Sequence, residues 1–305
     1  MIQQKVRVWT VRELMKFAID HLQKLGFEET RLTVELLLSH ALGCQRIQLY
    51  TSFDKPLTKE ELARFRSLYE RRLVHEPVQY IVGASNFMGL HLRVDPAVLI
   101  PRPETETLVE QVMMLGKELE KEREISIIEL GSGSGNIAIA LAKFVKNAEV
   151  VSIDSSEEAI ELARENAISC NVESRIDFKV IDMFEPVDQL LLRRFDILVS
   201  NPPYISKEDW EGLSTEVKRY EPRNALTDLK DGFEFHQRIV ELAPYLLRNN
   251  GVTFVEVGYG QAKRVADMMR NSGFSEVSTV PDLQGIQRVV KGVCPSNVRA
   301  FANNN

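Results

Sequence analysis

The chain has 305 residues, of which 44% are hydrophobic and 27% are charged, and these fractions exclude a fibrous or largely disordered protein. Its formal net charge of -6 disfavours duplex nucleic acid as a partner, because proteins that bind duplexes gain much of their affinity by neutralising phosphates. The first residues lack the apolar core of a signal peptide, and no later run approaches the roughly 20 apolar residues that cross a bilayer, so we expect a cytoplasmic protein without a membrane partner.

Residues 1–76 carry the pattern of a small all-helical domain. Apolar side chains recur at spacings of three and four over residues 14–25 and again over residues 32–37, which is typical of amphipathic helices. A third helix is predicted to start at Thr58, because Glu61 completes a capping box with it.

Residues 77–104 differ in character from the helical domain that precedes them. Apolar stretches at residues 80–82, 86–89 and 90–94 predict short strands around a turn, so we expect a hairpin linker here. A helix is then predicted over residues 105–120.

From residue 126 onward, apolar strands alternate with amphipathic helices. This alternation predicts an α/β fold in which residues 105–293 form a mostly parallel, doubly wound sheet of seven strands with helices on both faces. Ligands of such sheets bind at the carboxyl ends of the strands. Residues 294–305 are expected to form a flexible tail. The strands are predicted at residues 126–130, 149–154, 176–181, 196–200, 251–257, 275–280 and 287–291, and helices between them include residues 137–144, 157–167 and 233–248.

A glycine-rich loop follows the first of these strands. Glycines let the backbone turn sharply and approach a ligand closely, while the free amides at the start of the next helix favour a negative group. Asp154 ends the second strand and suits the hydroxyls of a ribose. These features fit NAD and S-adenosylmethionine equally, because the loop can also be read as a dinucleotide fingerprint. The loop reads Glu129-Leu130-Gly131-Ser132-Gly133-Ser134-Gly135.

Three other strand-end residues are candidates for contact with a cofactor. Asp182 and Met183 end the third strand, where a carboxylate suits the amine of an adenine and an apolar side chain suits its ring. A surface turn with a capping Asp182 is the alternative. Glu129 suits the amino group of a cofactor, and a simple polar strand end is equally open.

The fourth strand delivers Asn201-Pro202-Pro203-Tyr204 to the same edge of the sheet. Two prolines fix φ and lack an N–H, so the loop is rigid and presents carbonyl groups. The Asn201 side-chain oxygen and the Pro202 carbonyl can accept both hydrogens of an –NH2 group. Tyr204 can lie against a planar target. The alternative is a proline-rich turn with no chemical role.

This tetrapeptide predicts methyl transfer to a planar amide or amino nitrogen. An amide nitrogen is a poor nucleophile because it shares its lone pair with the carbonyl. The sulfonium of S-adenosylmethionine is a good leaving group, so in-line positioning, which can contribute about 7–11 kcal/mol, supplies most of the catalysis. S-adenosylmethionine is therefore favoured as the cofactor, and a nicotinamide-dependent oxidoreductase would leave the tetrapeptide unexplained. No metal site is expected, because the three cysteines are far apart.

The chain resembles the HemK-type release factor glutamine methyltransferases over nearly its whole length. The resemblance implies the Rossmann-like fold of methyltransferases that use S-adenosylmethionine, with the glutamine of the Gly-Gly-Gln loop in class 1 peptide-chain release factors as substrate. Residues 99–106 are the most specific of the shared segments. Besides these and the tetrapeptide, the shared segments are residues 76–83, 87–90, 220–226, 256–261 and 288–292.

The resemblance also assigns roles to single positions. Gly131 through Gly135 become the cofactor loop, bordered by Asn201, and Asp154 becomes the ribose carboxylate. Asp182 and Met183 lie beside the adenine, and Asn201, Pro202 and Tyr204 become the catalytic residues of a glutamine-binding loop that includes Pro203. Glu129 and Ser132 stand where many members have Asp and Thr, and Thr227 stands where many have Gly.

Several questions stay open at this point. The resemblance implies that the helical domain recognises the body of the release factor, and four arginines of the third helix could contact it, although such a run is more often a solvated face. Residues 101–104 are either a stiff connector into a helix or part of the site. An adenine-specific DNA methyltransferase is the main alternative, because the tetrapeptide can also hold an adenine amine. An inactive binding module is another. The four arginines are Arg64, Arg66, Arg71 and Arg72.

Overall fold

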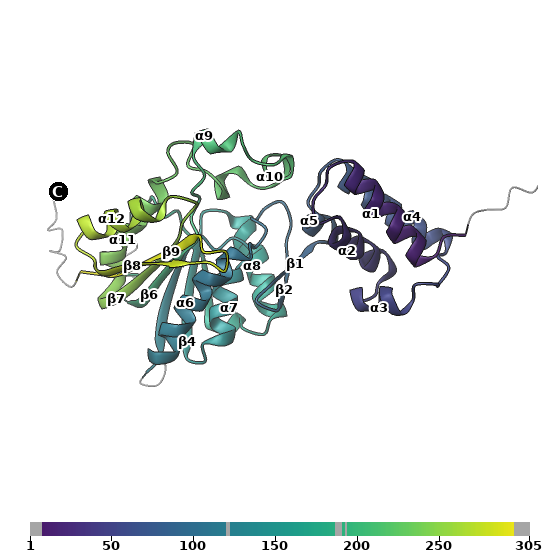
Figure 1. The fold of residues 1–305 in the computed structure, drawn as a ribbon. Coiled ribbons are helices and arrows are strands. Elements are labelled where there is room, and N and C mark those ends of the chain that lie inside the picture. Colours follow the sequence, from purple (N-terminus) through teal and green to yellow (C-terminus); the bar gives the residue numbers. More distant parts are fainter. Residues whose placement is uncertain (1–7, 120–122, 187–190, 193, 296–305) are drawn as a thin grey trace, which may run out of the picture. The chain divides into compact units, whose positions relative to one another are not determined.

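The fold is taken from a computed structural model, which describes residues 8–119, 123–186, 191–192 and 194–295. The chain divides into two compact units (Figure 1). Unit 1 consists of the described residues up to Gly83 together with Thr215–Tyr220, and unit 2 consists of Ala84–Ser214 and the described residues from Glu221 onward. Among the described helices, none is long and apolar enough to cross a membrane.

Unit 1 is all-helical, as the sequence predicts. Helix α1 begins after Thr10 and helix α4 begins after Thr58, and both threonines form capping boxes, so the predicted box at Thr58 is confirmed. The prediction of a strand at residues 80–82 is wrong, because this stretch is a short helix that ends at Gly83. The helices are α1 (Val11–Lys24), α2 (Thr30–Leu42), α3 (Arg46–Thr51), α4 (Lys59–Leu73), α5 (Val78–Val82) and α10 (Thr215–Tyr220).

The boundary of unit 1 differs from the expected end of the helical domain at residue 76. Val78 and Ile81 on α5 pack into the same core as Leu37 and Phe65, so the chain leaves this core only after Gly83. Hydrophobic burial, rather than the change in sequence pattern, therefore sets where unit 1 ends.

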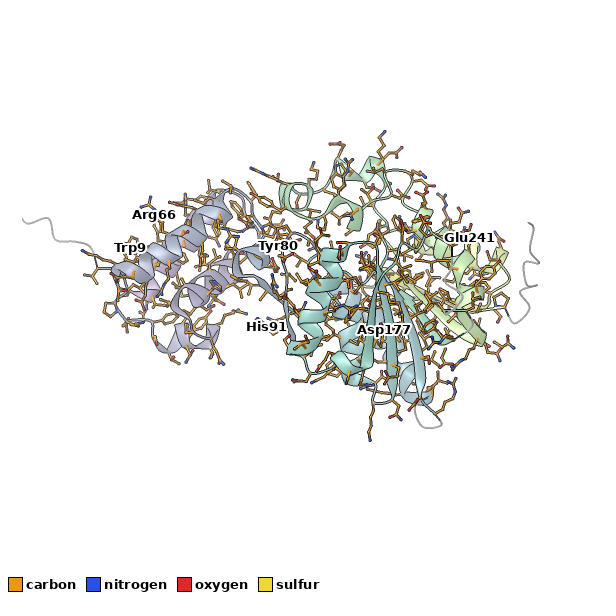
Figure 2. All side chains as sticks on the ribbon, turned by 180° about the vertical axis from the view of Figure 1, so that it is seen from behind. Trp9, Arg66, Tyr80, His91, Asp177 and Glu241 are labelled. Atoms are coloured by element: carbon orange, nitrogen blue, oxygen red, sulfur yellow. The ribbon has the colours of Figure 1, made fainter. Side chains whose placement is uncertain are left out.

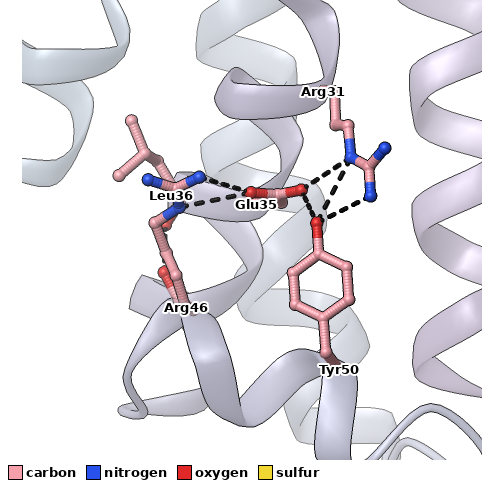
Figure 3. Close-up of polar contacts among 6 residues, drawn as sticks. Arg31, Glu35, Leu36, Arg46 and Tyr50 are labelled. Carbon is pink, nitrogen blue, oxygen red and sulfur yellow. Dashed lines mark hydrogen bonds and ion pairs between the residues drawn. The ribbon is translucent and has the colours of Figure 1, made fainter.

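A buried carboxylate joins α2 to α3 within unit 1 (Figure 3). The Glu35 side chain is 3% exposed and accepts hydrogen bonds from Arg31 Nε at 3.0 Å, from Arg46 Nη2 at 2.6 Å and from the Tyr50 hydroxyl. Burial alone would raise the pKa of Glu35, but the three donors outweigh it and lower the pKa. The cluster therefore holds an ionised carboxylate inside the helical unit.

Helix α10 belongs to unit 1 although its neighbours in sequence belong to unit 2. The Tyr220 hydroxyl donates to the Val74 carbonyl at 2.9 Å, and Arg72 pairs with Glu216. Arg72 is buried and also donates to the Glu76 carbonyl, so it is no part of a solvated face. Arg66 is exposed and pairs with Glu70.

Unit 2 opens with the predicted hairpin. Strands β1 (Ala84–Phe87) and β2 (Leu90–Arg93) pair in antiparallel register around a turn at residues 88–89. Asn166 on α8 (Glu157–Ser169) anchors this hairpin: its side chain accepts from the Arg93 amide at 2.7 Å and donates to the Ser134 carbonyl at 2.9 Å. The hairpin is thereby tied to the glycine-rich loop.

The rest of unit 2 confirms the predicted seven-stranded sheet, whose strand order is β5-β4-β3-β6-β7-β9-β8. All neighbouring pairs from β5 to β7 are parallel, and β9 is antiparallel to both of its neighbours. The strands are β3 (Ile125–Leu130), β4 (Ala148–Asp154), β5 (Ile176–Val180), β6 (Phe195–Ser200), β7 (Leu247–Glu256), β8 (Ser275–Pro281) and β9 (Gln287–Val293). The side chains are drawn in Figure 2, where Asp177 marks β5.

Helices cover both faces of the sheet (Figure 1). Because successive strand residues point to opposite faces, Ile127 packs into one core cluster with helices α6, α7 and α8, and Ile128 into the other with α11 and α12. These helices are α6 (Glu104–Leu119), α7 (Asn136–Phe144), α11 (Glu234–Leu246) and α12 (Ala262–Asn271), and the short elements are η1 (Glu173–Arg175), α9 (Lys207–Trp210) and η3 (Arg223–Ala225).

The order of the strands also locates the crevice of the sheet. From β3 the chain proceeds outward to β4 and β5, and it then returns to form β6 on the other side of β3. Doubly wound sheets bind ligands at such a switch point, beyond the carboxyl ends of the two central strands. At the end of the chain, Cys294 is buried, and residues 296–305 of the expected tail lie outside the described residues.

Candidate active site

A cavity of about 210 Å³ opens at this switch point. Most of the residues that the sequence assigned to a cofactor or substrate line it, although they come from four different strand ends. Four of the assigned residues do not line it: Glu129, Gly135, Pro202 and Tyr204. Those that do are Gly131, Ser132, Gly133, Ser134, Asp154, Asp182, Met183, Asn201 and Pro203.

The glycine-rich loop brings the cofactor side of the cavity close to the tetrapeptide. A Cβ atom on Gly131 would lie 3.9 Å from the Asn201 carbonyl oxygen. Gly135 has a packing role instead, because a Cβ there would lie 3.0 Å from Ala163 on α8 and 3.0 Å from Ile139. With φ at 79° it also begins α7, so that this helix starts directly behind the loop.

Asp154, at the end of β4, accepts two backbone hydrogen bonds in the cavity wall. Its Oδ2 accepts from the Gly133 amide at 2.9 Å, and its Oδ1 accepts from the Ser156 amide at 3.0 Å. The carboxylate therefore lies beside the glycine-rich loop and faces the cavity. Its role as an acceptor for ribose hydroxyls stays a prediction.

The third strand end forms an apolar corner of the cavity. Asp182 Oδ1 accepts from the Phe184 amide at 2.9 Å, so the capped turn that was the alternative for Asp182 is present in the cavity wall. Met183 and Phe184 line this corner, and the Phe184 ring packs edge-on against Phe235 with centroids 5.2 Å apart. Arg238 on α11 fixes the turn by donating to the Met183 carbonyl at 2.8 Å.

Glu129 lies outside the cavity, contrary to the expectation of a contact with a cofactor amino group. Its side chain is fully buried and accepts from the Ser152 hydroxyl on β4. Burial raises the pKa of Glu129 to about 8, and the nearby charge of Asp154 acts in the same direction. Glu129 is therefore a buried carboxyl group beneath the glycine-rich loop.

The tetrapeptide is held at its first residue by a contact between side chains. Asn201 Nδ2 donates to the Thr105 hydroxyl at 3.1 Å, and Thr105 is 1% exposed on the first turn of α6. The residue before the tetrapeptide, Ser200, donates to the Leu130 carbonyl at 2.6 Å and so links the ends of β6 and β3. Asn201 and Pro203 then face the cavity.

Tyr204 turns away from the cavity, although it was expected to lie against the target. Its carbonyl accepts from Gln261 Nε2 at 2.8 Å, and its hydroxyl lies 3.5 Å from Glu256 Oε1. Two glycines leave room for it: a Cβ on Gly232 would lie 2.4 Å from the Tyr204 carbonyl oxygen, and one on Gly258 would lie 3.0 Å from its ring. Burial raises the pKa of Tyr204, so the hydroxyl keeps its proton.

Two further segments contribute to the cavity. Ala97 and Val98 follow the hairpin, and Asn224 follows the loop beyond the tetrapeptide. Arg102, whose role the sequence left open, lines the cavity and donates to buried Glu221 at 2.6 Å. Both residues lie in segments of the family resemblance, residues 99–106 and 220–226, and the ion pair between Arg102 and Glu221 shows that these segments are in contact.

Known proteins resemble this chain over most of its length. Residues 13–83 match a family model described as "PrmC N-terminal domain", and residues 121–280 match one described as "Methyltransferase domain". A protein of Geobacter sulfurreducens named "Release factor glutamine methyltransferase" is 43% identical over 289 residues, which cover 95% of this chain and 98% of that protein. A protein of the same name from Chlorobaculum tepidum is 42% identical, covering 92% and 96%. Among solved structures, a methyltransferase from Pyrococcus furiosus has a TM-score of 0.49 at 18% identity, covering 77% of this chain and 98% of that one.

Proposed function

Because this chain belongs to the family of release factor glutamine methyltransferases, we propose that it methylates the side-chain amide nitrogen of the glutamine in the Gly-Gly-Gln loop of class 1 release factors, with S-adenosylmethionine as the methyl donor. One observation carries the proposal. The backbone of Asn201 lies beside the glycine-rich loop at Gly131, so the residue that grips an amide borders the cofactor cavity. A cytoplasmic location follows from this substrate.

The residues that line the cavity suit the ribose, the adenine ring and the carboxylate of S-adenosylmethionine. Asp154 offers acceptor oxygens for ribose hydroxyls, and Met183 and Phe184 offer an apolar corner for the adenine ring. The glycine-rich loop and the first amides of α7 suit the carboxylate of the methionine part. When bound, the cofactor supplies an electrophilic methyl group on a sulfonium that leaves as a neutral thioether.

The task of the protein residues is to hold the glutamine amide in line with that methyl group. The side-chain oxygen of Asn201, which lines the cavity, accepts one amide hydrogen, and the carbonyl of Pro202, which adjoins Asn201 but does not itself line the cavity, accepts the other. These two contacts turn the nitrogen lone pair toward the donor. Such positioning can contribute about 7–11 kcal/mol of the barrier reduction. A strong general base is unnecessary, because the attacked nitrogen becomes acidic as it gains the methyl group and releases its proton to water.

Mass spectrometry of a release factor after incubation with this protein and S-adenosylmethionine tests the function. We expect a single added methyl group on the Gly-Gly-Gln glutamine. Asn201→Ala should abolish it, whereas Asn271→Ala, an exposed change at the end of α12, should not. An unmodified glutamine, under conditions where calorimetry shows that the cofactor binds, would refute the substrate.

Unit 1 would recognise the body of the release factor. Two observations support this role: the match of residues 13–83 to the PrmC N-terminal domain, and helix α10, which follows the tetrapeptide in sequence yet belongs to unit 1. Reversing the charge of exposed Arg64 and Arg66 should raise KM for the intact factor but leave KM for a short Gly-Gly-Gln peptide unchanged. An equal change with both substrates would contradict the role.

A further inference from the structure

Two buried polar residues behind the tetrapeptide are still without a role. Glu256 ends β7 and is 1% exposed, and Thr105, on α6, is equally buried. Within the described part of the chain, Glu256 Oε2 has no hydrogen-bond partner. Burying a carboxyl group in this way is costly, so its retention calls for an explanation.

The two residues extend the contact of Asn201 into a chain of hydrogen bonds. Asn201 Nδ2 donates to the Thr105 hydroxyl at 3.1 Å, which occupies that hydroxyl as an acceptor. A hydroxyl has a single hydrogen to give, and a side-chain hydrogen bond from Thr105 acts to lower the pKa of Glu256, which directs that hydrogen to the Glu256 carboxyl group. The Tyr204 hydroxyl reaches the same carboxyl group at 3.5 Å.

We propose that Thr105 and Glu256 are positioning residues that fix the Asn201 amide with its oxygen, and not its NH2 group, toward the substrate nitrogen. The inference rests on the proposed function, because it concerns how that site recognises an –NH2 group. Glu256 accepts from Thr105, Thr105 accepts from Asn201, and the Asn201 oxygen is left to accept from the substrate.

The direction of these hydrogen bonds matters, because the oxygen and the NH2 group of an Asn side chain have nearly the same shape. A reversed Asn201 would present two N–H donors to the two N–H donors of the substrate amide, and the grip on the nitrogen would be lost. An acceptor at Glu256 prevents the reversal. Burial raises the pKa of Glu256 to about 7, and the hydrogen bond from Thr105 and the charge of Arg288 act to lower it.

Both proposed residues lie in segments that the family resemblance singled out without a role. Thr105 is part of residues 99–106, and Glu256 begins residues 256–261. Gln261 in the second segment holds the Tyr204 carbonyl at 2.8 Å, so the same segment secures both ends of the tetrapeptide.

Steady-state kinetics of three substitutions on the full chain test the proposal. Thr105→Val removes the hydroxyl at constant shape and should lower kcat about a hundredfold. The KM of the cofactor should stay the same. Thr105→Ser restores the hydroxyl and should recover most of the turnover. Thr253→Val is the matched control, because Thr253 is a buried threonine on β7 whose hydroxyl has no partner within the described residues, and it should leave kcat unchanged.

The opposite results would overturn the proposal. If Thr105→Val kept kcat within threefold of the original chain, or mainly weakened cofactor binding, Thr105 would not orient Asn201. Glu256→Gln offers a second comparison, because the new side chain has nearly the same shape as Glu256. Its NH2 group can donate to the Thr105 hydroxyl and so reverse the direction of the hydrogen bonds. We expect kcat to fall with this variant as well, and an unchanged kcat would remove Glu256 from the mechanism.

NMR of the Asn201 side-chain amide tests the orientation without any substrate. In the original chain one amide hydrogen should be protected from exchange by Thr105, and Thr105→Val should remove this protection while Thr253→Val keeps it. Equal exchange in all three proteins would overturn the proposal even if the release factor is methylated. Conversely, a protected amide in a protein that leaves the release factor unmodified would refute only the proposed substrate.

Discussion

The buried carboxyl group of Glu129 should make the stability of unit 2 depend on pH in a direction opposite to that of an ion-paired carboxylate. Its pKa is raised from 4.5 to about 8 in the folded chain, so the folded state holds the proton more tightly than the unfolded state. The stabilising contribution is therefore fully present below pH 4.5, and it is lost as the pH rises through about 8.

The size of the effect follows from the shift in pKa. Each pKa unit corresponds to about 1.4 kcal/mol, so a shift from 4.5 to about 8 corresponds to a loss on the order of 5 kcal/mol across this pH range. Glu129→Gln keeps an acceptor for the Ser152 hydroxyl but does not titrate. The variant should therefore gain stability relative to the original chain as the pH rises above 4.5, and the gain should level off above about pH 8.

Urea unfolding at pH values between 5 and 9 measures this difference. Trp210 lies in unit 2 and Trp9 in unit 1, so replacing Trp9 by Phe leaves the fluorescence of Trp210 to report on unit 2 alone. Glu149→Gln, an exposed change on the neighbouring strand β4, is the control and should show no such trend. If the difference in unfolding free energy between Glu129→Gln and the original chain did not change with pH, the reasoning about Glu129 would be wrong.

Two other substitutions have clear expectations. Gly232→Ala should lower both the melting temperature and kcat, because the new Cβ would lie 2.4 Å from the Tyr204 carbonyl oxygen. Gly26→Ala is the control, because Gly26 has a similar φ but open space around it, so this change should lower the free energy of unfolding by only about 1 kcal/mol. Equal melting temperatures of the two variants would contradict this. Glu35→Gln should destabilise unit 1 by about 1–3 kcal/mol at pH 7, because the pKa of Glu35 is lowered in the folded chain and the ionised carboxylate is stabilising there. This contribution is lost as the pH falls through the folded pKa of Glu35. Thermal unfolding at pH 7 and pH 3 checks this, and a cost no smaller at pH 3 than at pH 7 would count against it.

The local pattern of the sequence was sufficient for the seven-stranded sheet and for the edge at which most of the candidate residues meet. Alternating apolar strands and helices predicted the seven-stranded sheet, and the strand ends placed the glycine-rich loop, Asp154 and Asn201 at one edge. These features depend on the period of a few neighbouring residues and on the rule that parallel strands end at the same edge, so they can be read without knowing any distant contact.

Tertiary structure alone decided which way the side chains at these strand ends point and which partners they meet. Glu129 and Tyr204 turn away from the cavity, and Asn201 contacts Thr105, which lies 96 positions earlier in the sequence. The regular alternation of side chains stops at the end of a strand, so the sequence pattern does not determine to which side a side chain there points. Contacts between residues so far apart depend on how α6, β6 and β7 pack together, and that packing is a property of the whole core rather than of any local segment.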